Sequence, residues 1–410
     1  MTDTVTTTLA TTLQLPCGAV LPNRIAKAAM SEQLAQRDGT TTDKLHRLYA
    51  VWGRSGAGLL ITGNVMIDRD ALTEPGNVIL DDARDLDGIR AWAGAAKEGG
   101  AQVWMQINHP GKVAVAPFDK RPVAPTAIRS TVPGYNIRKP RTLTAGDIDV
   151  LIGRFARTAE LAMAGGFDGV QIHAAHGYLL SQFLSPLSNH REDAWGGDPE
   201  RRMRLLLDVV SAVRGTIGSD QPIAVKLNSR DFTHGGFGTG DALEVALALA
   251  AAGIDLLEIS GGGYEAPAMT GVARGQEDRP HEAYFAEFAE QLRAHTDLPI
   301  MLTGGLRTPA HMSTLVSNGT VDVIGLGRPM TFVPNYPARI LAGERPTLPR
   351  GPRRTGYRPL DGYLELAWHN AQIHRITAGK TPQRHPGAHT IARAATRLTK
   401  AAARQATIPR

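Results

Sequence analysis

Two histidines and a tyrosine are crowded into six residues of this 410-residue chain. His173, His176 and Tyr178 belong to the segment VQIHAAHGYLL, which the pattern predicts to begin as a buried strand and to run into a helix. Two imidazoles and a phenol can donate hydrogen bonds to an oxygen atom of a small molecule, and a phenol can also deliver a proton. These three residues are the candidate catalytic group.

Two other interpretations of the histidine pair stay open. The spacing H-x-x-H resembles half of a zinc site, but neither an H-E-x-x-H motif nor an obvious third ligand accompanies it, so no metal site is predicted. The pair could instead cap a helix or satisfy carbonyl groups of the core. A place at the end of a barrel strand would favour chemistry over that structural role.

Glycine-rich turns near the end of the chain indicate an anion site. The segment MLTGGLRTP places Gly304 and Gly305 directly after one predicted strand, and VIGLGRPM places Gly327 and Arg328 after the next. Exposed backbone N–H groups and a guanidinium bind phosphate well, although such glycines also serve merely as turns. The combination favours a phosphorylated ligand.

Two polar residues lie in or near apolar strands. Three interpretations of Lys226, in PIAVKLN, stay open: a cation that faces a ligand, a Schiff-base nucleophile, and the partner of Glu258 in an ion pair. Gln106, in VWMQINHPG, could bind the imide-like edge of a heterocycle, although a solvated loop glutamine is equally common.

Eight short apolar runs alternate with segments of helical spacing, which is the pattern of repeated β–α units. The predicted strands are 24–28, 59–62, 102–107, 169–173, 223–227, 256–259, 300–302 and 323–326. The predicted helices include 148–163, 200–213, 241–252, 281–295 and 308–318. The count of eight favours a closed (β/α)₈ TIM barrel over a doubly wound open sheet, and no G-x-G-x-x-G follows the first strand.

Irregular segments interrupt this barrel pattern. Residues 108–146, with six prolines, form a long excursion after the third strand, and 190–200 form a polar loop after the fourth. We assign 1–344 to the barrel and 345–410 to a C-terminal extension, made of a helix at 360–377 and a basic tail. Both loops follow strand ends, where such barrels build their sites.

The charge is unevenly distributed. The formal charge is +6, but eight of the 45 basic residues and no acidic ones follow residue 365, so 1–365 carry 37 basic against 39 acidic residues. We therefore expect no nucleic-acid partner for the barrel.

The single cysteine, Cys17, excludes a disulfide framework or a cysteine-ligated cluster within one chain. No signal peptide or membrane span is evident, which predicts a cytoplasmic protein. A homo-oligomer stays open as a partner of the chain.

The motifs together resemble those of the Old Yellow Enzyme family, flavin-dependent ene-reductases on a (β/α)₈ barrel. The matching segments lie between about 21 and 341 and are LPNRIAKAAMSE, GAGLLITGNV, MQINHPGK, FDGVQIHAAHGYLLSQFLSPLSNHRED, GGDPERRMRLLLDVV, LTGGL and GLGRP. HAAHGYLLSQFLSP followed by GG-x-x-x-x-RR is the most specific of them.

The resemblance implies a cofactor, FMN, lying across the mouth of the barrel. It would place Ala29, Met30 and Ser31 beside the isoalloxazine, Gly63 and Gln106 at its polar edge, Lys226 near N1 and O2, and Gly304, Gly305, Gly327 and Arg328 around the phosphate. NADH or NADPH would reduce the flavin. His173 and His176 would then polarise the oxygen of an α,β-unsaturated carbonyl or hold a phenolic ligand, FMN would give a hydride to the β-carbon, and Tyr178 would protonate the α-carbon.

This chain departs from the family pattern at three places. Lys226 stands where most relatives have Arg, Ser31 where they have Thr or Cys, and Gln33 where one subgroup has a Tyr. Two alternatives remain: a cofactor-free barrel aldolase or isomerase using Lys226, and a flavin- or ligand-binding protein without turnover.

Overall fold

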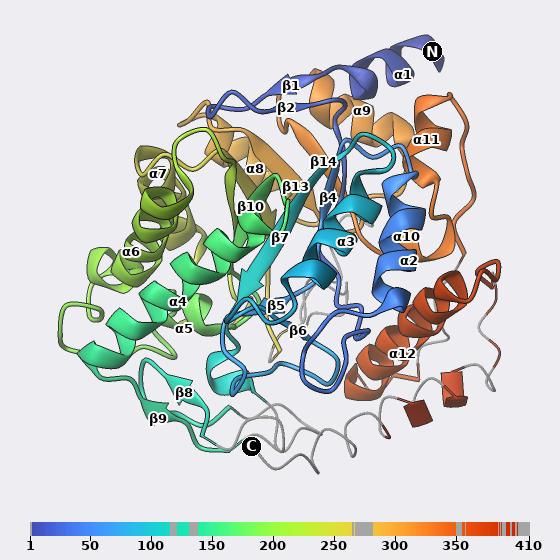
Figure 1. Ribbon diagram of the computed structural model, residues 1–410. Coiled ribbons are helices and arrows are strands. Elements are labelled where there is room, and N and C mark those ends of the chain that lie inside the picture. The colour runs from blue at the N-terminus through green and yellow to red at the C-terminus, as the bar shows by residue number, and fades with distance from the viewer. Residues whose placement is uncertain are drawn as a thin grey trace.

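Eight parallel strands form a closed ring in the computed structural model (Figure 1). The structure describes residues 2–114, 121–130, 138–264, 282–349 and 358–383, together with 266, 355–356, 385, 387, 391–393, 396–397 and 400. The ring strands are β3 (Ile25–Lys27), β4 (Leu59–Ile61), β7 (Gln102–Asn108), β10 (Gly169–Ala174), β11 (Ile223–Asn228), β12 (Leu256–Ser260), β13 (Ile300–Thr303) and β14 (Val323–Leu326). Each pairs with the next, and β14 pairs with β3, so the predicted (β/α)₈ barrel and all eight predicted strands are confirmed.

Helices follow most of the strands and cover the outside of the ring. They are α2 (Asp43–Gly53), α3 (Leu86–Lys97), α4 (Ala145–Ala164), α6 (Pro199–Ile217), α7 (Thr239–Ala251), α8 (Ala286–Arg293) and α9 (Pro309–Ser317). Capping explains several starts: the Thr144 hydroxyl and the Asp147 carboxylate form a reciprocal capping box at α4, and Asp198 caps α6 just before Pro199.

The predicted helix 281–295 is shorter in the structure, where α8 begins only at Ala286. The preceding residues make other contacts. Ala283 has a φ of 52°, in the left-handed region, and the Glu282 carboxylate accepts hydrogen bonds from the backbone and hydroxyl of Thr308. The start of the predicted helix is therefore used to hold α9, while residue 281 lies outside the described part of the chain.

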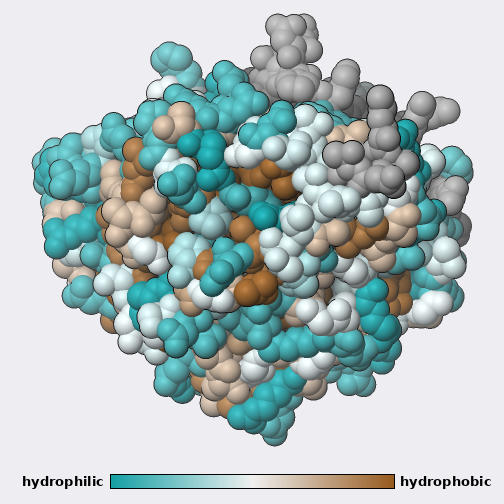
Figure 2. All heavy atoms as spheres, turned by 90° about the horizontal axis from the view of Figure 1, so that it is seen from above, coloured by the Kyte–Doolittle hydropathy of each residue, from teal (hydrophilic) through white to brown (hydrophobic). Residues whose placement is uncertain are grey.

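Smaller elements close the two ends of the barrel. At the N-terminal end lie α1 (Thr2–Ala10) and the hairpin of β1 (Leu13–Gln14) and β2 (Val20–Leu21). Figure 2 views this end and shows mostly hydrophilic residues with small hydrophobic groups between them. At the opposite end, β5 (Val65–Met66) and β6 (Val78–Ile79) extend the sheet from the end of β7.

The predicted excursion after β7 contains short elements. They are a 3₁₀ turn (Gly111–Val113) and the parallel pair β8 (Val123–Ala124) and β9 (Arg141–Thr142). Residues 115–120 and 131–137 of this excursion lie outside the described residues. Four further short or late helices are α5 (Leu179–Leu184), α10 (Pro329–Phe332), α11 (Tyr336–Leu341) and α12 (Arg358–Thr377).

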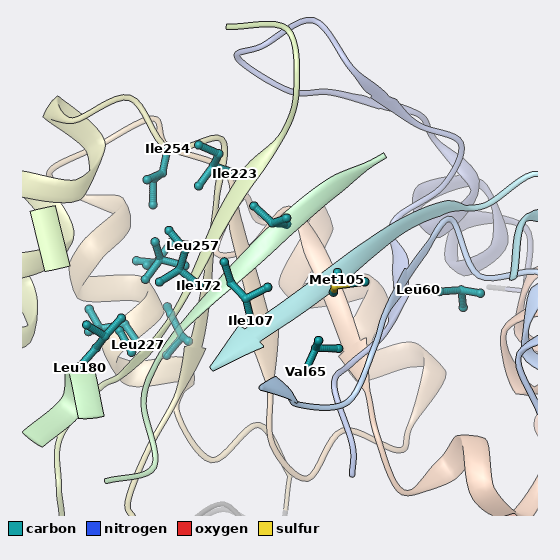
Figure 3. Packing of buried hydrophobic residues seen from close by; sticks show 14 of the residues in the cluster. Leu60, Val65, Met105, Ile107, Ile172, Leu180, Ile223, Leu227, Ile254 and Leu257 are labelled. Carbon is teal, nitrogen blue, oxygen red and sulfur yellow. The ribbon is translucent and has the colours of Figure 1, made fainter. Parts of the chain in front are cut away.

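Two separate hydrophobic layers hold the barrel together. Outward-facing strand residues such as Ile172 and Leu257 pack under the helices, and Figure 3 shows part of this layer. Inward-facing residues such as Trp104, Leu256 and Met301 fill the bottom of the barrel with Leu15 and Leu21 of the closing hairpin. Successive strand residues therefore alternate between the two hydrophobic layers, as expected for strands that are buried on both faces.

The C-terminal helix α12 lies along the barrel rather than away from it. In Figure 1 it runs beside α2, and Phe332 of α10 stacks on Trp368 and His369 with ring centroids 5.7 and 5.0 Å apart. Most of the basic tail beyond residue 383 is outside the described residues. Among those described, no helix is long and apolar enough to cross a membrane.

The outer hydrophobic layer should dominate stability. Leu257→Ala, at a side chain with no exposed surface, should lower the free energy of unfolding by about 2–5 kcal/mol because it leaves a cavity under the helices. Val150→Ala, at a side chain that is 55% exposed, should change it by less than about 0.5 kcal/mol. Denaturant unfolding followed by circular dichroism compares them, and equal midpoints would contradict the assignment of this layer.

Candidate functional site

A polar layer lies inside the barrel, directly above the apolar bottom. Lys226 of β11 and Glu258 of β12 are in register, and Lys226 Nζ lies 2.9 Å from Glu258 Oε1. The Glu258 carboxylate also accepts hydrogen bonds from Gln171 Nε2 at 2.6 Å and from the Thr303 hydroxyl at 2.7 Å. Gln106 Nε2 in turn donates to Gln171 Oε1 at 2.7 Å. The ion pair offered by the sequence as one interpretation of Lys226 is therefore present.

This layer is closed to water. Glu258 has no exposed surface and Lys226 is 3% exposed, so each charge depends on the other and on the surrounding hydrogen bonds. The Gln106 amide is oriented by its bond to Gln171 and by its backbone N–H, which donates to the Thr62 hydroxyl at 2.9 Å. The result is a fixed polar floor with a cation in it.

The candidate catalytic group lies at the mouth of the barrel, one layer above this floor. His173 is the last inward-facing residue of β10, and its ring centroid is 5.0 Å from that of His176 and 4.8 Å from that of Tyr178. His176 has a φ of 61° and is followed by Gly177 at 74°. This left-handed turn folds the chain back, so that three residues close in sequence face one another.

Hydrogen bonds hold each of the three rings. The His176 imidazole Nε2 is 2.7 Å from the Ser260 hydroxyl of β12, and the His176 backbone N–H donates to Asn228 Oδ1 of β11. The Ala175 backbone N–H donates to His173 Nδ1 at 3.2 Å, which leaves the ring proton of neutral His173 on Nε2. The Tyr178 hydroxyl lies 3.0 Å from the Tyr264 hydroxyl and accepts from Asn64 Nδ2 at 3.2 Å.

Both imidazoles are neutral at physiological pH. Burial holds the pKa of His173 well below its ordinary value, and the neighbouring His176 and Lys226 lower it further. Burial and Lys226 likewise hold the pKa of His176 well below the ordinary value. A neutral imidazole offers one N–H donor without placing a positive charge beside the ligand.

The predicted flavin-bordering segment follows β3. Met30 and Ser31 are partly exposed at the mouth, while Ala29 packs against the inner apolar layer. The Ser31 hydroxyl hydrogen-bonds with the Glu74 carboxylate. Both backbone groups of Gly63 are engaged, because its N–H donates to Glu32 Oε1 at 2.9 Å and its carbonyl accepts from the Thr62 hydroxyl.

The predicted phosphate residues come together because β13 and β14 are neighbours. Gly304 and Gly305, at the end of β13, have φ values of 129° and 76°, and a Cβ at either would lie 2.8 Å or less from the rings of Phe285 or Tyr284. A Cβ on Gly327 would lie at an ordinary van der Waals distance of 3.6 Å from Met30 Sδ, so the β14 end lies beside the β3 segment.

Arg328 directly precedes α10 beside these glycines, and its ion-pair partner lies in the C-terminal extension. Its Nη1 lies 3.2 Å from Glu365 Oε1 of α12. His369 Nε2 is 3.3 Å from the same carboxylate oxygen, and His369 Nδ1 is 2.8 Å from the Thr331 hydroxyl. Burial raises the pKa of Glu365, but the hydrogen bonds and charges of His369 and Arg328 outweigh this and lower it overall.

Sequence reasoning missed Asn108, the last residue of β7. It is 1% exposed, and within the described part of the chain neither Nδ2 nor Oδ1 has a hydrogen-bond partner. Residues two apart on a strand face the same side, so Asn108 faces the barrel interior at the mouth, as Gln106 does below it. A signal was available, since polar residues recur at every second position in Gln171 and His173, Lys226 and Asn228, and Glu258 and Ser260.

The same sequence pattern and fold occur in known proteins. Residues 17–346 match the model of the NADH:flavin oxidoreductase / NADH oxidase family. The NADH-dependent flavin oxidoreductase iccE of Talaromyces variabilis is 36% identical over 361 residues, covering 81% of this chain and 86% of the relative. The old yellow enzyme homologue from Zymomonas mobilis superimposes with a TM-score of 0.71 at 27% identity, covering 82% of this chain and 92% of that one. The complex of 2-naphthoyl-CoA reductase with 2-naphthoyl-CoA gives a TM-score of 0.77 at 26% identity, covering 83% and 53%.

The neutral histidines predict a pH dependence of stability. A group whose pKa is lowered by folding binds fewer protons in the folded than in the unfolded protein, so stability falls as the pH drops below about 6.5. His173→Gln should reduce that slope by up to about 1.4 kcal/mol per pH unit, while His190→Gln, at an exposed residue, should leave it unchanged. Unfolding midpoints measured from pH 7.5 to 5 give both slopes, and identical slopes would rule out a buried neutral His173.

The buried ion pair predicts strong coupling between its two members. Glu258→Gln leaves Lys226 buried without a carboxylate and should cost about 3–5 kcal/mol of unfolding free energy. Adding Lys226→Met to Glu258→Gln removes the stranded charge and should recover part of that loss. Denaturant unfolding of the two single variants and the double variant completes the cycle. Simple additivity would show that the charges do not interact.

Proposed function

Because the chain belongs to the NADH:flavin oxidoreductase / NADH oxidase family, with FMN and NADH or NADPH as its cofactors, we propose that it reduces the activated C=C bond of α,β-unsaturated carbonyl compounds. The observation that supports this best is the cluster of His173, His176 and Tyr178 at the barrel mouth, above Lys226. Two N–H donors and a phenol converge where a ligand oxygen and its neighbouring carbon would lie.

The residues around the mouth fit FMN. The buried Asn108 amide, unpaired within the described residues, offers both a donor and an acceptor near Gln106. These groups suit a heterocycle edge that carries N–H and C=O groups. At the ends of β13 and β14, the backbone at Gly304 and Gly327 and the Arg328 guanidinium suit a phosphate.

The proposed cofactor contacts follow from this placement. Ala29, Met30, Ser31 and Gly63 border the isoalloxazine, and Lys226 supplies positive charge beneath it. Since the Gly63 N–H is already bonded to Glu32, its contact with the cofactor would be through packing or its carbonyl oxygen. We further propose that 1–344 form the FMN-binding body and that α12 of the extension supports Arg328 from outside.

FMN, when bound, supplies hydride chemistry, accepting a hydride from NAD(P)H and passing one to the substrate β-carbon. His173 Nε2–H donates to the substrate carbonyl oxygen and stabilises the negative charge that develops there. His176 can donate as well when its Nε2 accepts from the Ser260 hydroxyl, which places its proton on Nδ1. A phenolate oxygen would satisfy the same two donors, so phenols should bind as inhibitors.

Tyr178 completes the reaction by protonating the substrate α-carbon. Its hydroxyl lies between Asn64, which donates to it, and the Tyr264 hydroxyl 3.0 Å away. Asn64 therefore occupies an acceptor site of the phenol oxygen, and Tyr264 can return a proton to it. The hydride on the β-carbon and the proton on the α-carbon together convert C=C to CH–CH.

The comparisons favour this reaction over the aldolase alternative for Lys226. That residue lies in an ion pair with Glu258, and the matched family is defined by flavin rather than by Schiff-base chemistry. The remaining alternative, a flavin-binding protein without turnover, is distinguished by the next experiment.

Tyr178→Phe should separate binding from turnover. The variant should bind FMN and be reduced by NADH or NADPH as the wild type is, but its turnover of 2-cyclohexenone should fall by about 10²–10⁴-fold because the proton donor is gone. Stopped-flow absorbance of the flavin measures both half-reactions. His173→Asn with His176→Asn is the companion variant, and it should weaken the long-wavelength absorbance change on adding a phenol. Unchanged enone turnover in Tyr178→Phe would remove the proposed proton donor.

A further inference from the structure

A buried carboxylate lies directly behind the segment that would border the flavin. Glu32 is 6% exposed, and its Oε1 accepts hydrogen bonds from the Gly63 backbone N–H at 2.9 Å and from the Tyr49 hydroxyl. Glu32 follows β3 and Gly63 follows β4, so this one side chain joins the ends of two neighbouring strands. The tyrosine that completes the contact comes from α2 on the outside of the barrel.

A buried cation accompanies this carboxylate. Lys27, on the outward face of β3, has no exposed surface, and its Nζ donates to the Ile61 carbonyl at 2.7 Å and to the Tyr49 hydroxyl at 3.4 Å. The ammonium also lies 4.6 Å from the Trp52 ring centroid. Burial lowers the pKa of Lys27 to about 8, while the charge of Glu32 opposes that shift. The two charges therefore support one another through Tyr49.

The space at Gly63 shows how closely the parts fit. A Cβ there would lie 2.2 Å from Glu32 Oε2 and 2.3 Å from the Met30 carbonyl oxygen. Glu32 thus fills the place that a larger residue at 63 would need, and it holds the Met30 and Gly63 backbones at a fixed separation. On its other side the same segment is tied to Glu74 through the side chains of Ser31 and Gln33.

We propose that Glu32 is a positioning residue of the flavin site, which sets the gap between the Met30 and Gly63 backbones through Gly63, with Tyr49 and Lys27 as its buried support. This rests on the proposed function, in which those two backbones border the isoalloxazine. Glu32 acts through its neighbours and need not touch the cofactor. Its negative charge, so close to the proposed polar edge, also opposes the gain of electrons by FMN.

Glu32→Gln tests the proposal because it keeps the side chain's size and removes its charge. The dissociation constant of this variant for FMN should rise at least about tenfold, since the hydrogen bonds to residue 32 lose their charged acceptor. The midpoint potential of bound FMN should become more positive. Flavin fluorescence titration of the apoprotein gives the affinity, and a dye-coupled reduction gives the potential. The control, Glu98→Gln, makes the same change at an exposed ion pair with Arg54 and should leave both values unchanged.

Tyr49→Phe is a second variant, which keeps the charges of Glu32 and Lys27. It tests the positioning role of Glu32 if Glu32→Gln does not fold. It should weaken FMN binding by about threefold through loss of one donor to Glu32. Unchanged FMN affinity and potential in either folded variant would overturn the proposal. A wild-type protein that binds no FMN would instead overturn the proposed function itself, so the two failures are distinguishable.

Discussion

The buried ion pair of Lys226 and Glu258 is the constraint on which the interior of this barrel depends. Two opposite charges placed inside a ring of strands are costly unless each is paired and every remaining hydrogen-bonding position is satisfied. Gln171, Thr303 and, through Gln171, Gln106 supply those partners from three further strands. A slip of one residue in any of these strands would turn its polar side chain outward and leave a charge unsupported.

That constraint divides the barrel interior into layers with different tasks. Apolar residues such as Trp104 and Leu256 close the bottom, and the ion pair and its amides form a rigid floor. The side chains of the proposed ligand site lie in the layer above this floor. The same cation that the floor requires also helps to keep His173 and His176 uncharged. One lysine therefore contributes both to the buried ion pair and to the neutral state of the two histidines at the mouth.

The sequence predicts the barrel, and it identifies three side chains that the fold brings together, because both signals are local. Apolar runs identify the strands, and His173, His176 and Tyr178 come together through one left-handed turn within six residues. Their supports are different: Ser260 lies 84 positions from His176, and Glu365 lies 37 from Arg328. Such partners are set by the order of strands around the ring and by the docking of α12, which no spacing pattern in one segment encodes.

Local sequence patterns also do not reveal the contacts that cross the boundary assigned at residue 344. Composition changes there, and the family match ends nearby at 346, yet α12 packs on α10 and pairs with Arg328. A change in composition reports where the regular pattern stops, whereas the physical unit extends as far as its contacts do. The helix at 360–377 was visible in the sequence through its spacing, but its docking partner was not.

The attachment of α12 also bears on how the protein is made. Synthesis runs from the N-terminus, so all eight barrel strands leave the ribosome before α12 does, and the ring can close while Arg328 still lacks its carboxylate partner. The contact between Arg328 and Glu365 therefore forms only after α12 has been synthesised.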